Sequence, residues 1–193
     1  MGKSVLYMSM SLDGFITGPD DGPENGLGTG GERLHEWLGK PTAALPHFDP
    51  PGLSGQVFAE LMATGAVVVG RKTFEYGQWD GDHHGVPIFV PTRATPLPPQ
   101  SGWVHFVPDA ETAMRAAKAA AGEKNVMVHG ARLAQTLLRE ALLDEVEIHL
   151  IPVVLGSGRR LFGTDPAELE LTRVLAAPGV THLHYRVGAP TSA

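Results

Sequence analysis

Arg71 and Lys72 follow directly on a glycine that ends an apolar run. The run, residues 66–69, has a composition typical of a strand covered on both faces, and it stops at Gly70. A helical turn is expected next, in which Thr73 can cap free N–H groups, and the start of a helix carries roughly +0.5 of a charge. Two cations beside a helix start are suited to binding phosphate, although a solvated basic turn would also explain this segment on its own.

A second segment has the same form. Residues 126–128, Val-Met-Val, reach His129 and Gly130, and a spacing of leucines typical of a helix follows. The N–H groups at the start of that helix are available to an anion. They belong to Ala131, Arg132 and Leu133.

Together the two segments predict a dinucleotide site. Strand-to-helix connections of one parallel sheet lie at its carboxyl edge, where open α/β sheets bind their ligands. A dinucleotide has enough phosphate groups to engage both segments at once. Arg71 and Lys72 would suit a ribose 2′-phosphate, which favours NADP over NAD.

The sequence matches two better-known nucleotide-binding motifs in residue type but not in the structural context that each motif requires. Residues 26–31 satisfy G-x-G-x-x-G, but a loop rich in Pro and Asp precedes them instead of the hydrophobic strand that a Rossmann turn requires. Residues 65–73 resemble a P-loop with one residue too many, but the residues between its glycines are apolar and Arg71 displaces the lysine. We interpret residues 26–31 as a flexible loop and exclude a nucleotide triphosphatase.

The surrounding pattern indicates the elements that position these segments. Strands are expected at residues 4–11, 66–70, 88–90, 104–107 and 126–128, and helices at 32–38, 54–64 (with Ser54 as N-cap), 110–121 and from 133 onward. Residues 13–31 are dominated by Gly, Asp, Pro and Asn, which predicts a long loop. The order of strands and helices points to a largely parallel sheet with crossover helices.

The last third of the sequence changes character. Residues 145–150, 168–171 and 182–187 alternate apolar and polar side chains, as strands with one polar face do. The last two of these strands can pair antiparallel, with acidic residues opposite basic ones, each pair adding about 0.2–1 kcal/mol. The predicted sheet is therefore mixed, parallel early and antiparallel at its C-terminal edge.

Composition limits the class of protein. The chain has 193 residues, enough for one large domain, and residues 1–193 are expected to form a single unit. A formal charge of -6 gives no overall attraction to nucleic acid or to an anionic membrane. The absence of cysteine excludes disulfides and thiolate metal sites, and no apolar stretch is long enough to span a membrane. A soluble cytoplasmic protein is expected.

Several histidines and tryptophans have competing interpretations. His83 and His84 lie between glycines, which favours a solvated loop, and His182 and His184 can share a strand face, as some metal sites need. No third ligand is evident, and pairing with the acidic strand accounts for the latter two, so no metal site is predicted. The residues that could stack on a flat heterocycle, or equally pack in the core, are Trp37 and Trp79.

With these residues in place, the chain resembles the dihydrofolate-reductase-like superfamily. It is most similar to the reductase domain of riboflavin-biosynthesis deaminase-reductases and to its stand-alone relatives. The resemblance covers about four-fifths of the chain, as far as Phe162. It is carried, in order, by residues 11–16 (SLDGFI), 69–74 (VGRKTF), 129–131 (HGA), 143–145 (LDE) and 152–162 (PVVLGSGRRLF).

The resemblance implies a three-layer α/β/α fold that binds NADPH across the carboxyl edge of the sheet. The positions that match the contacts to the adenosine-side phosphates are Gly70, Arg71, Lys72 and Thr73, and those that match the pyrophosphate and ribose cradle are Gly130, Ala131, Arg132 and Leu133. Ser9 and Ile16 match positions that line the nicotinamide pocket, and Asp13 matches a residue beside the substrate. Relatives commonly dimerise, so a homodimer is expected.

Two positions depart from the family's pattern. Many relatives have Gly-Gly where this chain has His129-Gly130. Dihydrofolate reductases carry a carboxylate early on the helix before the Gly-Arg strand, where this chain has Ser54, and the nearest preceding carboxylate is Asp49. Because reduction of a pterin C=N bond needs a proton donor there, folate reduction itself is not expected. The catalytic candidates are Asp13, as a polar group at the substrate, and Asp49, for proton delivery.

The leading hypothesis is an NADPH-dependent reductase that delivers hydride to a small heterocyclic (pterin- or aminopyrimidine-like), imine or carbonyl substrate. The glycine-rich loop at residues 13–31 would act as its lid. An alternative is a dinucleotide-binding protein of the same fold without turnover. A metal-dependent hydrolase that uses the histidines is the third and weakest hypothesis.

Overall fold

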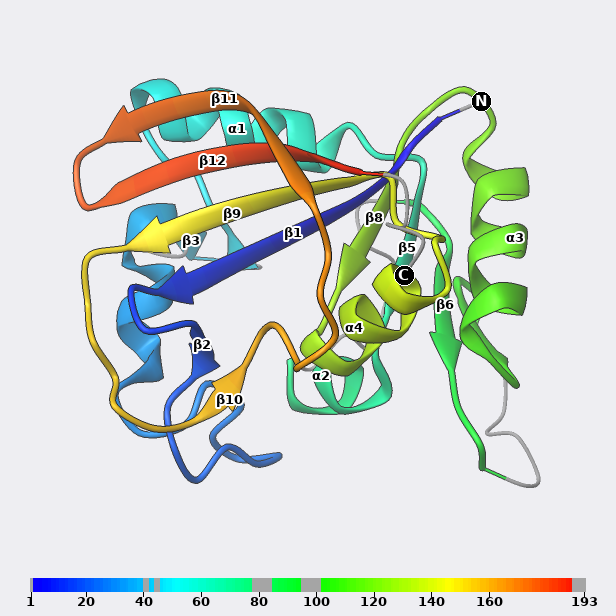
Figure 1. Cartoon of the computed structure of the whole chain (residues 1–193), viewed down its shortest axis with the longest axis horizontal. Coiled ribbons are helices and arrows are strands. Elements are labelled where there is room, and N and C mark those ends of the chain that lie inside the picture. Colours follow the sequence, from blue (N-terminus) through cyan, green and yellow to red (C-terminus); the bar gives the residue numbers. More distant parts are fainter. Residues whose placement is uncertain (1, 40–41, 44–45, 78–84, 95–101, 189–193) are drawn as a thin grey trace.

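The computed structural model describes residues 2–39, 42–43, 46–77, 85–94 and 102–188. Within these ranges a single eight-stranded sheet lies between two layers of helices (Figure 1). No helix of the described part is long and apolar enough to cross a membrane. The fold is the predicted three-layer α/β/α type.

The main sheet has the strand order β11-β12-β9-β1-β8-β5-β6-β7. Its strands are β1 (Ser4–Ser11), β5 (Ala66–Val69), β6 (Ile88–Pro91), β7 (Val104–Val107), β8 (Val126–His129), β9 (Glu145–Ile151), β11 (Leu169–Ala177) and β12 (Val180–Val187). Two small antiparallel pairs join β2 (Phe15–Thr17) to β10 (Arg159–Arg160) and β3 (Thr42–Ala43) to β4 (Pro46–His47).

The sheet is mixed in the predicted way. β1 pairs parallel with β8 and β9, and β5, β6, β7 and β8 are also parallel neighbours. β12 pairs antiparallel with both β9 and β11. Glu170 stands opposite Arg186, and their side chains form an ion pair at 2.8 Å, so the predicted pairing of an acidic with a basic strand is confirmed.

Helices cover both faces of the sheet. α3 (Ala110–Ala121) and α4 (Ala131–Arg139) lie on one face, and α1 (Gly52–Met62), α2 (Arg71–Tyr76) and the 3₁₀ helix η1 (Gly31–Leu38) lie on the other. Figure 1 shows α4 in front of the sheet and α1 behind β11 and β12. Asp109 caps α3, since its Oδ1 accepts a hydrogen bond from the backbone N–H of Thr112 at 2.7 Å.

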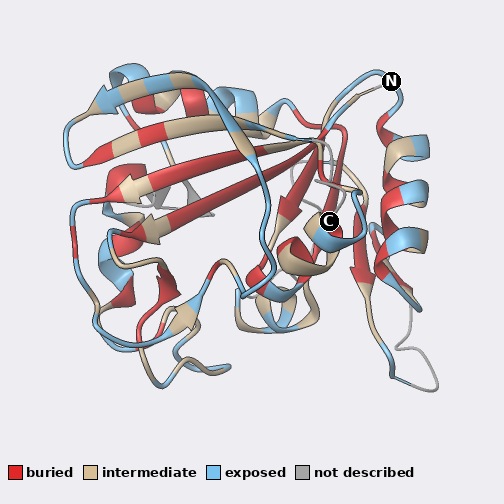
Figure 2. Cartoon of the chain, in the orientation of Figure 1, coloured by how far each residue is buried: buried red, intermediate tan, exposed pale blue. Residues whose placement is uncertain are grey.

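Successive side chains along the central strands pack alternately into two cores, one on each face of the sheet. On β1, Leu6 and Met8 pack with α3 and α4, while Val5 and Tyr7 pack toward α1 and α2. In Figure 2 the strands β1, β5, β8 and β9 are buried along most of their length, whereas the edge strand β11 is largely exposed. Apolar side chains on both faces are what a parallel sheet between helices requires.

Two sequence predictions are wrong in detail. Ser54 is not the N-cap of α1, because that helix begins at Gly52 after Pro51. The Ser54 hydroxyl instead hydrogen-bonds His182 Nε2 at 3.1 Å, a contact between residues far apart in the sequence. The predicted loop at residues 13–31 also contains the short strand β2, which pairs with β10.

Ser4 joins the start of β1 to the turn before β9. Its buried hydroxyl lies 2.8 Å from both the carbonyl oxygen of Leu142 and Oδ2 of Asp144, and its backbone N–H donates to the same Oδ2. Burial alone would raise the pKa of Asp144, but the hydrogen bonds from Ser4 and the ion pair with Lys118 outweigh it and lower that pKa. The contact fixes one end of the parallel β1–β9 pair.

We predict that Ser4→Ala lowers the free energy of unfolding by about 0.5–1.5 kcal/mol, because it removes the hydrogen bonds of the buried Ser4 hydroxyl to the turn before β9. Urea unfolding followed by circular dichroism measures this loss. Ser157→Ala, at an exposed position, is the matched control and should change stability by less than about 0.5 kcal/mol. Equal effects of the two substitutions would contradict the role given to Ser4.

Candidate functional site

A cavity of about 790 Å³ opens at the carboxyl edge of the sheet, where β5, β6, β7 and β8 end. Its walls come from the first turns of α2 and α4 and from the segments that follow β6 and β7. The residues of the two first turns that line it are Gly70, Arg71, Lys72, Thr73, Gly130, Ala131, Arg132 and Leu133. Both sequence segments that were predicted to hold a dinucleotide therefore meet in one cavity.

The two segments meet because β5 and β8 are neighbours in register. Val69 stands opposite His129, and the backbone N–H of Gly70 donates to the carbonyl oxygen of His129 at 3.0 Å. Helices α2 and α4 therefore begin side by side. Gly70 is the N-cap of α2, so Thr73 lies inside its first turn and is not its cap.

Gly130 is the closest point of contact between the two segments. Its φ is 107°, a conformation that residues with a side chain rarely adopt. A Cβ added at this position would lie 2.7 Å from Thr73 Oγ1. A larger residue would both strain the backbone and displace the Thr73 hydroxyl, so Gly130 allows the two segments to approach this closely.

The cavity wall is positively charged in a chain that is negative overall. Six basic side chains line it, Arg71, Lys72, Arg93, Arg132, Arg139 and Arg159, against three acidic ones, Asp109, Glu111 and Glu140. Arg71, Arg139 and Arg159 each pair with a carboxylate outside the lining, so the cations that favour an anionic ligand are chiefly Lys72, Arg93 and Arg132. Arg93 was not singled out in the sequence, although its position just after β6 at the same sheet edge could have identified it.

Arg71 is held in place by its own neighbours. Its Nε donates to Glu75 Oε1 at 2.6 Å, one helical turn along α2, and its guanidinium lies 5.1 Å from the centre of the Phe106 ring. Lys72 lies 5.9 Å from the centre of the Tyr76 ring. These contacts position the two cations on the cavity side of α2.

The other predicted site residues lie outside the residues that line this cavity. Ser9 is buried, and its hydroxyl accepts a hydrogen bond from Trp37 Nε1 at 2.8 Å. Ile16 is buried in the core that α3 and α4 cover. Trp37 is therefore a core residue, and Trp79 falls outside the described residues, as do His83 and His84.

Asp13 ties the turn after β1 to the segment after β9. Its carboxylate accepts hydrogen bonds from the Ser11 hydroxyl at 2.6 Å and from the backbone N–H groups of Leu155 and Gly156 at 3.1 and 2.7 Å. The Ser11 hydroxyl and these N–H groups lower the pKa of Asp13 to about 2. Asp13 is thus an anion at neutral pH. Asp49, the other catalytic candidate, is exposed between β4 and α1.

A group of buried polar residues on the α1 side of the sheet was missed by the sequence analysis. Glu147 and His149 on β9 face His184 and His182 on β12, in direct register. We call these four side chains, of which His184 is only partly buried, the buried polar layer. The histidines of β12 were attributed to pairing with the acidic strand β11, but the carboxylates that contact His184 are on β9, and His182 contacts His149. The alternation of Glu145, Glu147 and His149 in the sequence was the signal for it.

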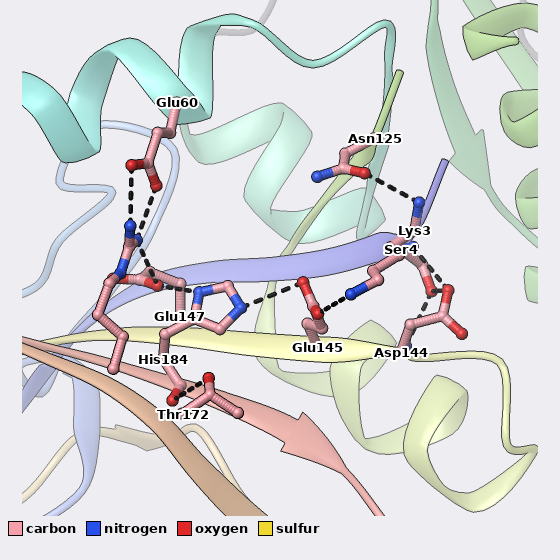
Figure 3. A network of polar contacts seen from close by, with 10 residues as sticks. Lys3, Ser4, Glu60, Asn125, Asp144, Glu145, Glu147, Thr172 and His184 are labelled. Atoms are coloured by element: carbon pink, nitrogen blue, oxygen red, sulfur yellow. Dashed lines mark hydrogen bonds and ion pairs between the residues drawn. The ribbon is translucent and has the colours of Figure 1, made fainter. Parts of the chain in front are cut away.

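Ion pairs extend from the buried polar layer to the surface. His184 lies between Glu147, which contacts its Nδ1, and Glu145, whose Oε2 is 3.1 Å from its Nε2 (Figure 3). The hydrogen bond that His184 donates to Glu147 and the charges of both carboxylates raise the pKa of His184. Arg173 on β11 forms a bidentate pair with Glu60 of α1 at 2.7 and 2.8 Å and reaches Glu147 at 3.4 Å.

Comparison with known proteins gives the class of fold and then the family. A candidate riboflavin biosynthesis protein from Shewanella sp. PV-4 superposes with a TM-score of 0.71 at 22% identity, covering 97% of this chain and 99% of that one. A diaminohydroxyphosphoribosylaminopyrimidine deaminase/5-amino-6-(5-phosphoribosylamino)uracil reductase from Thermotoga maritima superposes with a TM-score of 0.62 at 12% identity, over 97% of this chain and 57% of that protein. These neighbours define the architecture as dihydrofolate-reductase-like.

The sequence assigns the family directly. The family model described as the RibD C-terminal domain matches residues 3–183, so the chain belongs to that family. The uncharacterized protein YwjB of Bacillus subtilis (strain 168) is similar over nearly the whole length, with 27% identity over 198 aligned positions that cover 95% of this chain and 97% of YwjB. The resemblance inferred from the five sequence segments is confirmed.

We predict that Gly130→Ala lowers the free energy of unfolding by about 1–3 kcal/mol, because the strained backbone and the contact with Thr73 must both be relieved. Gly22→Ala is the control, since a Cβ there meets nothing within 4 Å. Thermal and urea unfolding of both variants measure the difference. A Gly130→Ala protein as stable as the Gly22→Ala protein would show that the approach of α2 to α4 is not as tight as described.

Proposed function

We propose that this chain is an NADPH-dependent reductase that transfers hydride to a small heterocyclic substrate, pterin- or aminopyrimidine-like, or to a related imine or carbonyl. The observation that carries the proposal is the basic cavity at the joined starts of α2 and α4. Membership of the RibD C-terminal domain family supports it, as does the reductase activity named for the Thermotoga maritima neighbour.

The residues present fit a dinucleotide phosphate. The backbone of Gly130 and the N–H groups at the start of the nine-residue helix α4 are suited to the pyrophosphate. Arg71 and Lys72 are suited to the 2′-phosphate of the adenosine ribose, with Arg93 on the adjacent wall. A Cβ at position 130 would meet Thr73 Oγ1 at 2.7 Å, so glycine allows the two segments of the proposed cradle to approach each other.

NADPH, when bound, supplies a hydride, and the chain supplies orientation and shelter from water. Ser9 and Ile16, on β1 and β2, are proposed to face the nicotinamide end of the site. Both strands lead into the turn that Asp13 anchors. Fixing this turn against the segment after β9 gives the substrate side of the site a stable wall.

The proton that accompanies hydride transfer does not come from Asp13 in this proposal. A carboxyl group with a pKa of about 2 has no proton to give at neutral pH. Asp49, which is exposed, and solvent remain the proposed sources. The same observation favours a second candidate function, a dinucleotide-binding protein of this fold without turnover.

We predict that the chain binds NADPH more tightly than NADH, and that the double substitution Arg71→Gln/Lys72→Gln raises the Kd for NADPH by about 10- to 100-fold. The Kd for NADH should change little, because NADH lacks the 2′-phosphate. Titration calorimetry or nicotinamide fluorescence measures both. Arg186→Gln is the control, since Arg186 is an exposed cation of β12 that pairs with Glu170.

Binding and turnover can be separated in the same preparation. Oxidation of NADPH in the presence of a panel of pterins, aminopyrimidines and quinones would support the reductase. Tight NADPH binding with no oxidation by any of them would support the second candidate function. If neither NADPH nor NADH binds, both functions are wrong.

We predict that Asp13→Asn lowers thermal stability above pH 4 and that the difference disappears as the pH falls toward 2. Because the pKa of Asp13 is lower in the folded chain than its ordinary value of 3.8, the ionised carboxylate stabilises the folded state at pH values above 3.8. This contribution is lost as the pH falls through the folded-state pKa of about 2. Melting curves of both proteins across this range test the sign. A kcat that titrates with the Asp13 carboxyl between pH 5 and 8 would contradict the assignment of a low pKa.

A further inference from the structure

Three side chains of metal-ligand type converge beneath α1 and η1. Glu147, His149 and His182 each offer one oxygen or nitrogen atom, and these atoms all lie within 4.8 Å of one another. Their side chains are 0%, 2% and 1% exposed. Three such groups gathered at full burial are unusual in a core, because each loses its hydration on folding.

Two atoms of this group have no hydrogen-bond partner among the described residues. They are Oε1 of Glu147 and Nε2 of His149. Leaving a buried acceptor unsatisfied costs free energy, and a carboxylate oxygen costs more than a neutral atom. A bound cation would satisfy both atoms at once.

The contacts of the two imidazoles show which nitrogen atoms an ion would use. The Nδ1 atoms of His149 and His182 lie 2.9 Å apart, so at most one of them can carry a proton in that contact. Because His182 Nε2 lies 3.1 Å from the Ser54 hydroxyl, His182 would bind an ion through Nδ1, and the ion would replace the contact between the two Nδ1 atoms. His149 would bind it through Nε2, which has no hydrogen-bond partner among the described residues.

The outer contacts of these side chains hold them in place. His182 Nε2 lies 3.1 Å from the Ser54 hydroxyl, and Glu147 Oε2 is held by His184 and Arg173. The Trp37 ring packs on both His149 and His182, with ring centres 4.4 and 5.1 Å away. Ligands fixed by outer hydrogen bonds and sheltered by an aromatic ring are typical of protein metal sites.

The charge around the group leaves room for a cation. Three carboxylates, Glu60, Glu145 and Glu147, are linked to two permanent cations, Lys3 and Arg173. This set carries one negative charge in excess before His184 is counted. A divalent ion bound beside Glu147 would bring this set to one net positive charge with His184 neutral, and the carboxylate in direct contact would offset part of the cost of burying the ion.

We propose that Glu147, His149 and His182 form a buried binding site for one divalent transition-metal ion, and that zinc is the ion it takes. Two imidazoles and a carboxylate are a common ligand set for zinc. The ion would join β9 to β12 directly and support the packing of Trp37 over the sheet. None of the three residues lines the basic cavity, so the site stands or falls independently of the proposed reductase function.

The test is the zinc content of the full chain after incubation with zinc and removal of free ion, measured by plasma mass spectrometry. The expected result is about one zinc per wild-type chain and less than about 0.1 in the double variant His149→Gln/His182→Gln. His105→Gln, on β7, is the control for loss of a histidine as such. The double variant His83→Gln/His84→Gln is the control for the other histidine pair, and both controls should retain one zinc.

Two results would overturn the proposal. One is a wild-type chain that retains less than about 0.1 zinc, and the other is a His149→Gln/His182→Gln protein that retains as much zinc as the wild type. Loss of zinc in the His83→Gln/His84→Gln protein with retention in the His149→Gln/His182→Gln protein would place the ion elsewhere and refute the assignment.

A measurement on the wild type decides the matter if the ligand variants do not fold. X-ray absorption spectroscopy of the zinc-loaded chain should show scattering from two imidazole rings and a light-atom shell near the Zn–N distance of about 2.0–2.1 Å. A zinc environment without imidazole scattering would refute the site. Zinc should also raise the melting temperature by several degrees, and EDTA should reverse the rise.

Discussion

The parallel pairing of β8 with β5 is the interaction on which the cavity depends. Val69 and His129 stand opposite each other, so both strands end at the same level and both helices begin there. The bond from the N–H of Gly70 to the carbonyl of His129 fixes this level. If the register slipped by one residue, the basic first turn of α2 would no longer meet Gly130, and every inward side chain of β8 would face the wrong layer.

The two faces of β9 meet different environments because the chain supplies different residues to each. Val146 and Ile148 pack into the apolar core that includes α3 and α4. Glu147 and His149 alternate with these residues along β9, so their side chains lie on the opposite face and belong to the buried polar layer beneath α1 and η1. Ion pairs to Arg173 and His184 offset the burial of Glu147, which would otherwise be costly in a low-dielectric interior.

Local pattern predicts most of the fold and the wall of the cavity that the first turns of α2 and α4 build. The bounds predicted from the sequence for Ser4–Ser11, Val104–Val107 and Ala110–Ala121 are those of the structure. Each of these segments has an uninterrupted pattern of side chains typical of a single strand or a single helix. The wall built by residues 70–73 and 130–133 follows from a general rule about strand ends in parallel sheets.

Contacts between side chains far apart in the sequence could not be predicted from the sequence. The bond of Ser54 to His182, and the meeting of Glu147 and His149 with the histidines of β12, depend on the register of β9 and β12. A residue's spacing says which side of a strand it occupies but not which residue lies opposite. For the same reason the anchoring of Asp13 by Leu155 and Gly156 could not be foreseen from residues 11–16.

The position of β1 has a consequence for how the chain folds. This strand lies between β8 and β9, so it finds its partners only after the long segment of chain that separates it from them has been made. Its flanking contacts join residues 122 and 140 positions apart, as in Lys3 with Asn125 and Ser4 with Asp144. Such long loop closures make folding slow and leave an apolar strand unpaired during synthesis. A central and largely buried strand of the finished sheet is thus the one that waits longest for its neighbours, and its apolar side chains are those that a chaperone would have to shield.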